Sequence, residues 1–341
     1  MKKRYYKIRT YINIIRKDLK NEFPISFLKK IQLWRKGFLA EKHTLYQFDK
    51  NDYKHYFSDY HASISRNINE PFNDLLTNKL VFSEVIGKVL KVPLTFGWIF
   101  NGIYYPKDES NIENLLLTNE NIVIKAVNGG GGKDVFIIKK EKKNDFVINN
   151  NKRLQKEELL KFIFTLNNFI VTEFIKPGYF SKSLNKDTVN TMRIITLMDP
   201  KTNKPFIARA VQRIGVKTSA PMDNFTKGGL SASIDLETGV LGDATSHPLN
   251  SSHTRYSSHP DTGFKFEGQV IPNWNDIKKE ILNGVDKLPM LKCVGWDFLL
   301  SDKGLVAIEG NHHPDPDVLQ GHSPILSDRR IYDFYKYHDI I

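Results

Sequence analysis

One stretch of the sequence, residues 295–311 (GWDFLLSDKGLVAIEGN), places three oxygen-bearing side chains among apolar residues. The pattern predicts two short strands joined by a turn at 301–304. Asp297 lies on the first strand, and Glu309 and Asn311 share one face of the second because they are two residues apart. Carboxylate and amide oxygens with no cysteine nearby suit Mg²⁺. The sequence therefore predicts a magnesium site here, and the alternative is an ordinary hairpin whose acids meet solvent or a lysine.

A run of four glycines lies within a second candidate hairpin, residues 121–140 (NIVIKAVNGGGGKDVFIIKK). Consecutive glycines between strands are costly in backbone entropy, so they need a reason. One reason is a loop whose backbone amides lie against phosphate oxygens, and the alternative is a mobile surface hairpin. Lys125 precedes the run and Lys133 follows it, and either can contact phosphate as a point charge. The run is not a Walker loop, because the following helix and the Lys-Ser/Thr pair are missing.

Two predicted strands, at 188–198 and 205–216, hold three arginines among apolar neighbours. These are Arg193, Arg209 and Arg213. A buried guanidinium needs an anion, either a structural Asp or Glu or a phosphate or carboxylate ligand. A structural pair is the simpler interpretation for any one of them, and three arginines in adjacent strands favour a ligand.

Three further segments bring polar groups next to predicted strands. The strand predicted at 169–175 (FIVTEFI) contains Glu173 and continues into a loop. Exposed backbone groups at such an edge can pair with adenine, and the nearby carboxylate can accept a hydrogen bond from a ribose hydroxyl. The loops at 224–230 (NFTKGGL) and 259–263 (HPDTG) combine glycine with polar side chains. These loops are candidates for binding an acceptor molecule.

The composition indicates a globular chain with more than one packed unit. It has 341 residues, of which 40% are hydrophobic and 12% aromatic. Its single cysteine, Cys293, excludes an intrachain disulfide and a cysteine-based zinc site, and it fits a reducing compartment. No apolar run approaches the length of a membrane span, and the N-terminus lacks a signal-peptide core. We therefore expect a cytoplasmic protein.

The formal charge of +12 is concentrated at the N-terminus. Residues 1–42 contain 13 Lys or Arg and 3 Asp or Glu, and the rest of the chain is nearly neutral. This distribution argues against an enzyme whose whole cleft is basic for nucleic acid. Apolar residues at helical spacing predict helices at 5–21 and 24–36. Such a segment can face an anionic surface, membrane or nucleic acid, and the alternative is a solvated basic helix face.

Taken in chain order, these features resemble the ATP-grasp superfamily. More narrowly, they are similar to the sugar-transfer-associated ATP-grasp group, which is related to α-L-glutamate ligases and found with polysaccharide genes. The resemblance covers roughly residues 30–325, and its most specific part is Asp297 followed by Glu309-Gly-Asn311. The other residues that carry it are Lys125, the glycine run, Glu173, Asn190, Arg193, Arg213 and the NFTKGG loop.

The resemblance implies an α+β fold in which two α+β lobes hold ATP between them. A basic helical extension and a small N-terminal subdomain precede the lobes. The expected divisions are a basic helical segment at 1–42, an N-terminal α/β subdomain at 43–110, a central lobe with a glycine flap at 111–180, and a C-terminal lobe with the Mg²⁺ and acceptor sites at 181–341. The N-terminal subdomain includes a helix expected at 79–92.

The resemblance also implies how ATP is held. Lys125 contacts the α- and β-phosphates, the glycines close over them as a flap, and Lys133 reaches the phosphates or the substrate. Glu173 binds the ribose, and the backbone of Phe174 and Ile175 binds the adenine. The flap consists of Gly129, Gly130, Gly131 and Gly132.

On the catalytic side, the resemblance implies that the acidic trio holds one or two Mg²⁺. Arg213 stabilises the γ-phosphate, and Arg193 is a further catalytic candidate. The candidates for acceptor binding are Asn190, Arg193, Arg209, Lys227, Gly228, His259 and Asp261.

The implied reaction joins a carboxylate to an amine through an acyl phosphate. By the family's context, the acid is a small-molecule or lipid-linked glycan and the amine a second substrate, in cell-surface polysaccharide synthesis. We expect contact between residues 1–36 and the inner face of an anionic membrane, and we do not expect nucleic acid as a partner. The alternatives are a phosphotransferase acting on a hydroxyl, with Asp261 or His259 as base, and a nucleotide-binding scaffold for glycosyltransferases.

Overall fold

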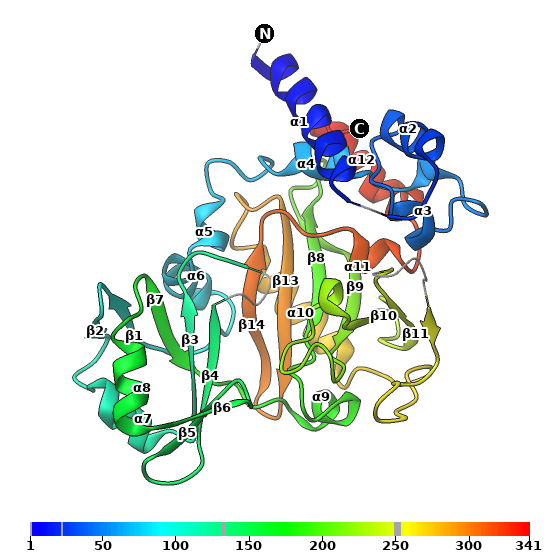
Figure 1. Ribbon diagram of the computed structural model, residues 1–341. Coiled ribbons are helices and arrows are strands. Elements are labelled where there is room, and N and C mark those ends of the chain that lie inside the picture. The colour runs from blue at the N-terminus through cyan, green and yellow to red at the C-terminus, as the bar shows by residue number, and fades with distance from the viewer. Residues whose placement is uncertain (1, 22, 131–133, 249–253) are drawn as a thin grey trace.

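The computed structural model describes residues 2–21, 23–130, 134–248 and 254–341. Two antiparallel sheets of seven strands each form the body of the protein, and helices from both ends of the chain pack together beside the second sheet (Figure 1). The α+β class predicted from the sequence is confirmed. In these ranges, no helix combines the length and the apolar character that a membrane crossing needs.

The first sheet has the strand order β2-β1-β7-β3-β4-β5-β6. Its strands are β1 Thr95–Phe100, β2 Ile103–Pro106, β3 Asn121–Ala126, β4 Val135–Lys140, β5 Asp145–Ile148, β6 Lys152–Gln155 and β7 Phe169–Glu173. Helices α7 (Ile112–Thr118) and α8 (Lys156–Ile163) pack on it, with Leu115 and Leu159 in one apolar cluster with Ile124 of β3. This cluster is the core of the smaller lobe.

Strands β1 and β2, which the sequence assigns to an N-terminal subdomain, belong to this sheet. β1 pairs antiparallel with β7, so that Trp98 lies opposite Ile170. Backbone pairing therefore joins both strands to the central lobe, and the structure has no division at residue 110. The hairpin of β5 and β6 was not predicted, because the polar run at 139–157 hides its short strands.

The second sheet has the order β12-β11-β10-β9-β8-β13-β14. Its strands are β8 Met192–Met198, β9 Pro205–Ile214, β10 Leu230–Ile234, β11 Leu241–Ser246, β12 Arg255–Tyr256, β13 Cys293–Ser301 and β14 Gly304–Asn311. Ile194 packs in one apolar cluster with Ile277 of α10 (Trp274–Val285), while the next residue, Ile195, packs in another with Phe334 of α12 (Arg329–Tyr337). Because β8 is buried on both faces, its sequence is apolar except at Arg193 and Thr196.

Helices cover both faces of the second sheet. On the Ile194 face lie α6 (Lys79–Val85), α9 (Tyr179–Leu184) and α10 (Trp274–Val285). The helix predicted at 79–92 ends at Val85 and continues as a 3₁₀ turn, Ile86–Lys88. The helices at the other face and the N-terminal end are α1 Lys2–Leu19, α2 Phe27–Arg35, α3 Lys42–Leu45, α4 Asp59–Ser65, α11 Asp317–Gln320 and α12 Arg329–Tyr337. Helix α5 (Asp74–Thr77) packs through Leu76 in the same cluster as Ile194. Three further 3₁₀ turns are Tyr53–His55, Phe225–Lys227 and Ile325–Ser327.

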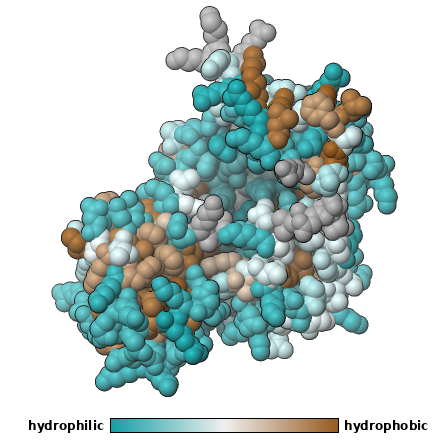
Figure 2. Space-filling view, in the orientation of Figure 1, coloured by the Kyte–Doolittle hydropathy of each residue, from teal (hydrophilic) through white to brown (hydrophobic). Residues whose placement is uncertain are grey.

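The two basic helices predicted at the N-terminus form, with apolar side chains left on their outer sides. Helix α2 begins at Phe27 because Ser26 caps it by accepting from the N–H of Lys29, so Pro24 lies before the helix and not in its first turn. Large apolar residues gather in brown at this end of the molecule (Figure 2). The exposed ones are Tyr5, Tyr6, Ile8, Ile12 and Leu19 on α1 with Phe27 and Leu28 on α2.

Candidate functional site

A cleft of about 340 Å³ lies between the two sheets. The first sheet contributes residues of β3, β4 and the end of β7, and the second contributes residues of β8, β9, β13 and β14. The volume is within the range of small-molecule sites. One wall is apolar, with Val123, Ile137 and Leu299, and the opposite end is lined by charged side chains.

Strand register brings the charged residues into one row. Arg193 on β8 lies opposite Asp297 on β13, and Asp297 lies opposite Glu309 on β14. On β9, Val211 lies opposite Arg193, and Arg213 shares its face because it is two residues further on. Neighbouring side chains on one sheet face are about 5 Å apart, so the four charges interact directly.

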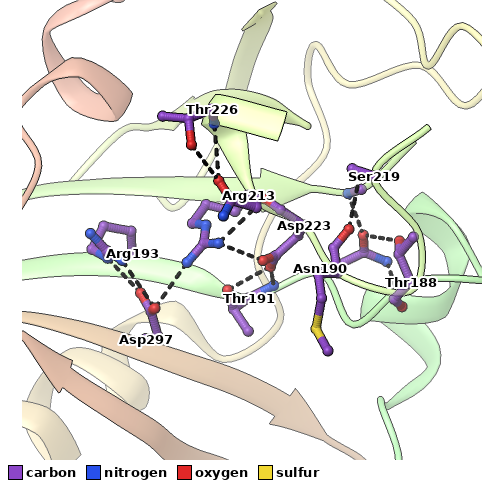
Figure 3. A network of polar contacts seen from close by, with 12 residues as sticks. Thr188, Asn190, Thr191, Arg193, Arg213, Ser219, Asp223, Thr226 and Asp297 are labelled. Atoms are coloured by element: carbon purple, nitrogen blue, oxygen red, sulfur yellow. Dashed lines mark hydrogen bonds and ion pairs between the residues drawn. The ribbon is translucent and has the colours of Figure 1, made fainter. Parts of the chain in front are cut away.

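Asp297 is the counter-ion of both arginines (Figure 3). Its Oδ2 accepts from the Arg193 guanidinium at 3.0 Å and from Arg213 at 2.9 Å. Burial alone raises the pKa of Asp297, but the two guanidinium groups outweigh it and hold the pKa below its ordinary value. Arg213 also pairs with Asp223 at 2.7 Å, and Asp223 accepts from the N–H of Thr191 at 2.6 Å.

Glu309 and Lys125 are charged groups in the same cleft without such partners. Neither side chain forms a hydrogen bond or ion pair with the described residues. Burial, and then the nearby Asp297, raises the pKa of Glu309. Burial lowers the pKa of Lys125 to about 8, although Glu309 acts in the opposite direction. The pKa of Lys125 stays below its ordinary value, so Glu309 compensates this partly buried charge only in part, and a further anion would stabilise it.

The glycine run borders the same end of the cleft. Gly129 and Gly130 line it, and the carbonyl of Gly129 accepts from Lys79 Nζ at 2.9 Å. Gly129 has a φ of 147°, a conformation that other residues rarely adopt. Gly131, Gly132 and Lys133, the remainder of the predicted flap, lie outside the described residues.

Comparison with known proteins agrees with this geometry. The family model for sugar-transfer associated ATP-grasp matches residues 60–322, most of the chain. The chain belongs to the sugar-transfer associated ATP-grasp family. No curated protein sequence matches it.

Solved structures resemble this ATP-grasp protein only distantly. An N5-carboxyaminoimidazole ribonucleotide synthetase in complex with ADP is 12% identical with a TM-score of 0.41, over 71% of this chain and 46% of its own. An L-amino acid ligase from Bacillus licheniformis is 13% identical with a TM-score of 0.40, over 75% and 46%. A D-alanine-D-alanine ligase from Coxiella burnetii is 13% identical with a TM-score of 0.39, over 78% and 58%. The chain thus spans less than half the length of the first two.

The remaining nucleotide-binding and metal residues predicted from the ATP-grasp resemblance also line the cleft. Glu173, Phe174 and Ile175 lie where β7 ends, and Glu173 accepts from the N–H of Leu94 at 3.3 Å. Asn311 lies beside Glu309 and donates from its amide nitrogen to the carbonyl of Gly295 at 3.3 Å, which leaves its amide oxygen as an acceptor. These residues stand on both sides of the charged row.

Several predicted acceptor residues have structural partners instead. Arg209 lies on the same sheet face as Arg213 but four residues earlier, roughly 13 Å along the strand, where it pairs with Asp328 at 3.2 Å. Asn190 is buried and donates to the carbonyls of Ser181 and Asn185.

The two loops predicted to bind an acceptor do not present these residues to the cleft either. The buried His259 contacts the carbonyl of Gly215 through Nε2 at 2.9 Å and accepts from the N–H of Asp261. The Asp261 carboxylate accepts from the N–H of Lys217 at 2.8 Å. Lys227 and Gly228 end a 3₁₀ turn outside the cleft, whose wall is formed by the preceding residues 222–226.

The cleft includes residues that sequence reasoning missed. Lys79 begins α6, far from the glycine run in sequence, and no local pattern marks it. Asp223 has a weak signal, an acid directly before the NFTKGG loop that the prediction did not use. His313 and Asp315 were not missed, because their place directly after the acidic trio suggests a role at its rim, and both line the cleft.

Proposed function

We propose that this protein is an ATP- and Mg²⁺-dependent carboxylate–amine ligase. The observation that carries the proposal is that Lys125 and Glu309, both partly buried, lie in one cleft and form no hydrogen bond or ion pair with the described residues. An anion beside Lys125 and a cation beside Glu309 would compensate both charges, and the phosphates of a metal-bound nucleotide supply that combination.

The residues present fit both groups. Lys125, Lys79 and the backbone at Gly129 would hold phosphate oxygens, and the edge after β7 would hold the nucleoside. Glu309 and the Asn311 amide oxygen would hold Mg²⁺. Asp297 would coordinate the same Mg²⁺ only with oxygens that also accept hydrogen bonds from Arg193 and Arg213. When bound, Mg²⁺ would neutralise charge on the transferring phosphoryl group.

In the proposed reaction, a carboxylate oxygen of the acid attacks the γ-phosphorus of ATP, which gives an acyl phosphate and releases ADP. An amine nitrogen then attacks the acyl carbon, the bond from carbon to the phosphate oxygen breaks, and the amine gives up a proton. Arg193 and Arg213, held in position by Asp297, would stabilise the negative charge that collects on the transferring group. We propose an acidic sugar or glycan as the acid, because the family is associated with sugar transfer.

A product assay tests this proposal against its alternatives. Amide product with ADP and phosphate supports a ligase, phosphorylated acceptor with ADP supports a kinase, and tight ATP binding without product supports a scaffold. The kinase alternative is weaker than the sequence suggested, since His259 and Asp261 are engaged with backbone groups.

Lys125→Met provides a direct test of nucleotide binding. We expect calorimetry to show Mg-ATP affinity weakened about 10- to 100-fold, because a charged hydrogen bond to phosphate is lost. Thermal stability should be unchanged or higher, since the variant no longer buries an uncompensated charge. Lys139→Met, the same change at an exposed site on β4, is the control. Equal affinities in the two variants would exclude Lys125 from the nucleotide site.

We further propose that α1 and α2 rest on an anionic membrane surface. Their exposed apolar residues lie among the Lys and Arg of residues 1–42, a combination typical of interfacial helices (Figure 2). The wild-type chain should sediment with vesicles of phosphatidylcholine and phosphatidylglycerol more than with phosphatidylcholine alone. The double variant Ile8→Glu/Leu28→Glu should lose most of this binding, whereas Val270→Glu, at an exposed apolar site outside these helices, should retain it. Equal sedimentation of the two variants would contradict this proposal.

A further inference from the structure

A second cavity, of about 760 Å³, lies next to the nucleotide cleft. Helix α1 and α4 form one side of it and the segment at 313–317 the other. Thr226, His313 and Asp315 line both cavities, so the two adjoin at the end of the cleft where the charged row lies.

Helix α1, which closes this cavity, is anchored to the rest of the fold. Asp18, at its C-terminal end, is fully buried and accepts from Trp34 Nε1 at 2.6 Å and from the N–H of Ala40 at 3.0 Å. Nearer its middle, Tyr11 packs edge-on against Tyr60 of α4. The cavity is therefore a feature of the folded chain.

Four cations and four acids line this cavity, and three of the acids are engaged by a single cation, Lys42. Arg9 and Lys17 on α1 and Arg66 after α4 form no ion pair with the described residues. The fourth cation, Lys42, is already surrounded by Glu41, Asp59 and Asp317. Three cations of the wall are thus available to an anion.

Two histidines add polar atoms without partners. Nδ1 of His247 and Nδ1 of His313 are buried and form no hydrogen bond with the described part of the chain. Buried polar atoms are normally satisfied, so a ligand with hydrogen-bonding groups fits here better than an apolar one.

We propose that this cavity binds the acid substrate, and that this acid carries a further anionic group, carboxylate or phosphate, besides the one that reacts. The inference rests on the proposed ligase function. The reacting carboxylate would reach the nucleotide through the shared wall at His313 and Asp315, while the rest of the molecule lies against Arg9, Lys17 and Arg66. A substrate with one negative charge would leave these cations unused.

Calorimetric titration of the full-length protein, with and without saturating Mg-ADP, tests the inference. The probes are trigalacturonate for carboxylates, glucose 1-phosphate for phosphate, and maltotriose as the neutral control. We expect at least one anion to bind and maltotriose not to bind, and the anion that binds identifies the group. Arg66→Gln and the double variant Arg9→Gln/Lys17→Gln should each weaken binding about fivefold or more, whereas Lys20→Gln, at an exposed lysine outside the cavity, should not.

The outcomes separate this inference from the ligase proposal. If Mg-ADP fails to bind, the nucleotide proposal fails, and the titration without nucleotide still reports on the second cavity. If neither anion binds, if maltotriose binds equally well, or if Arg66→Gln changes nothing, the inference about the cavity is wrong. Lys125→Met should not alter anion affinity, because Lys125 lies in the nucleotide cleft.

Discussion

Replacing Glu309 by glutamine is expected to lower product formation by on the order of 10²–10³-fold or more. Glutamine keeps the size and shape of the side chain but removes the negative charge that would hold Mg²⁺ against the phosphates. Because burial and Asp297 already raise the pKa of Glu309, the neutral amide should not destabilise the fold. Initial rates across a Mg²⁺ titration, together with thermal unfolding, measure both effects.

The matched control is Glu280→Gln on the exposed side of α10, which should keep full activity. A Glu309→Gln variant with normal turnover at low Mg²⁺ would remove this carboxylate from the metal site. Asp297→Asn is a less clear test, because Asp297 also balances two buried arginines and its loss should destabilise the protein. Loss of activity in that variant would therefore have two causes.

The acidic trio was predictable because it depends on one hairpin. The hairpin brings the three side chains to one end, but a regular register from the turn would set Asp297 opposite Ile308. A shift in register between Asp297 and Phe298, which the sequence does not reveal, sets Asp297 opposite Glu309. The glycine run and Lys125 belong to a second hairpin, β3 and β4, and the same argument applies. The local sequence pattern thus predicts the two hairpins that line opposite sides of the cleft.

The contacts between the β13–β14 hairpin and the strands that carry the arginines were not predictable. Arg193 and Arg213 meet Asp297 because β9, β8 and β13 are neighbours in the sheet, and sequence periodicity does not determine strand order. Arg209 fits the same pattern as Arg213, but the C-terminal segment covers its end of the strand and supplies Asp328 as a partner. Polar loop residues such as Asn190 suggest a surface site, whereas this one is buried to satisfy backbone carbonyls.

Residues of α1 and α3 line the second cavity, so the contact that fixes the N-terminal helices is the subject of the second test of large effect. Lys42, only 3% exposed, connects this segment to the far end of the chain through an ion pair with Asp317. Asp59 and Glu41 lie within 3.4 Å of the same ammonium group. Burial acts to lower the pKa of Lys42, but these acids outweigh it and raise the pKa well above its ordinary value.

Lys42→Met is expected to reduce the free energy of unfolding by about 3–5 kcal/mol, because it leaves buried carboxylates without a counter-ion. Urea denaturation at pH 7 measures the loss. Lys29→Met, which breaks the exposed pair with Asp49, is the control and should cost about 0–1 kcal/mol.

The pH dependence of the Lys42→Met deficit separates lost charge balance from lost packing. Without Lys42, the folded-state pKa of Asp317, which this ammonium group holds low, should rise above its unfolded value. The pKa of Asp59, which burial already raises to about 7, should rise further, so protonation favours the folded state of the variant more than that of the wild type. The deficit should therefore shrink as the pH falls from 7 toward 5, and Lys42→Met/Asp317→Asn should recover part of it. A deficit below about 1 kcal/mol, or one independent of pH, would mean that the ion cluster does not hold the N-terminal helices in place.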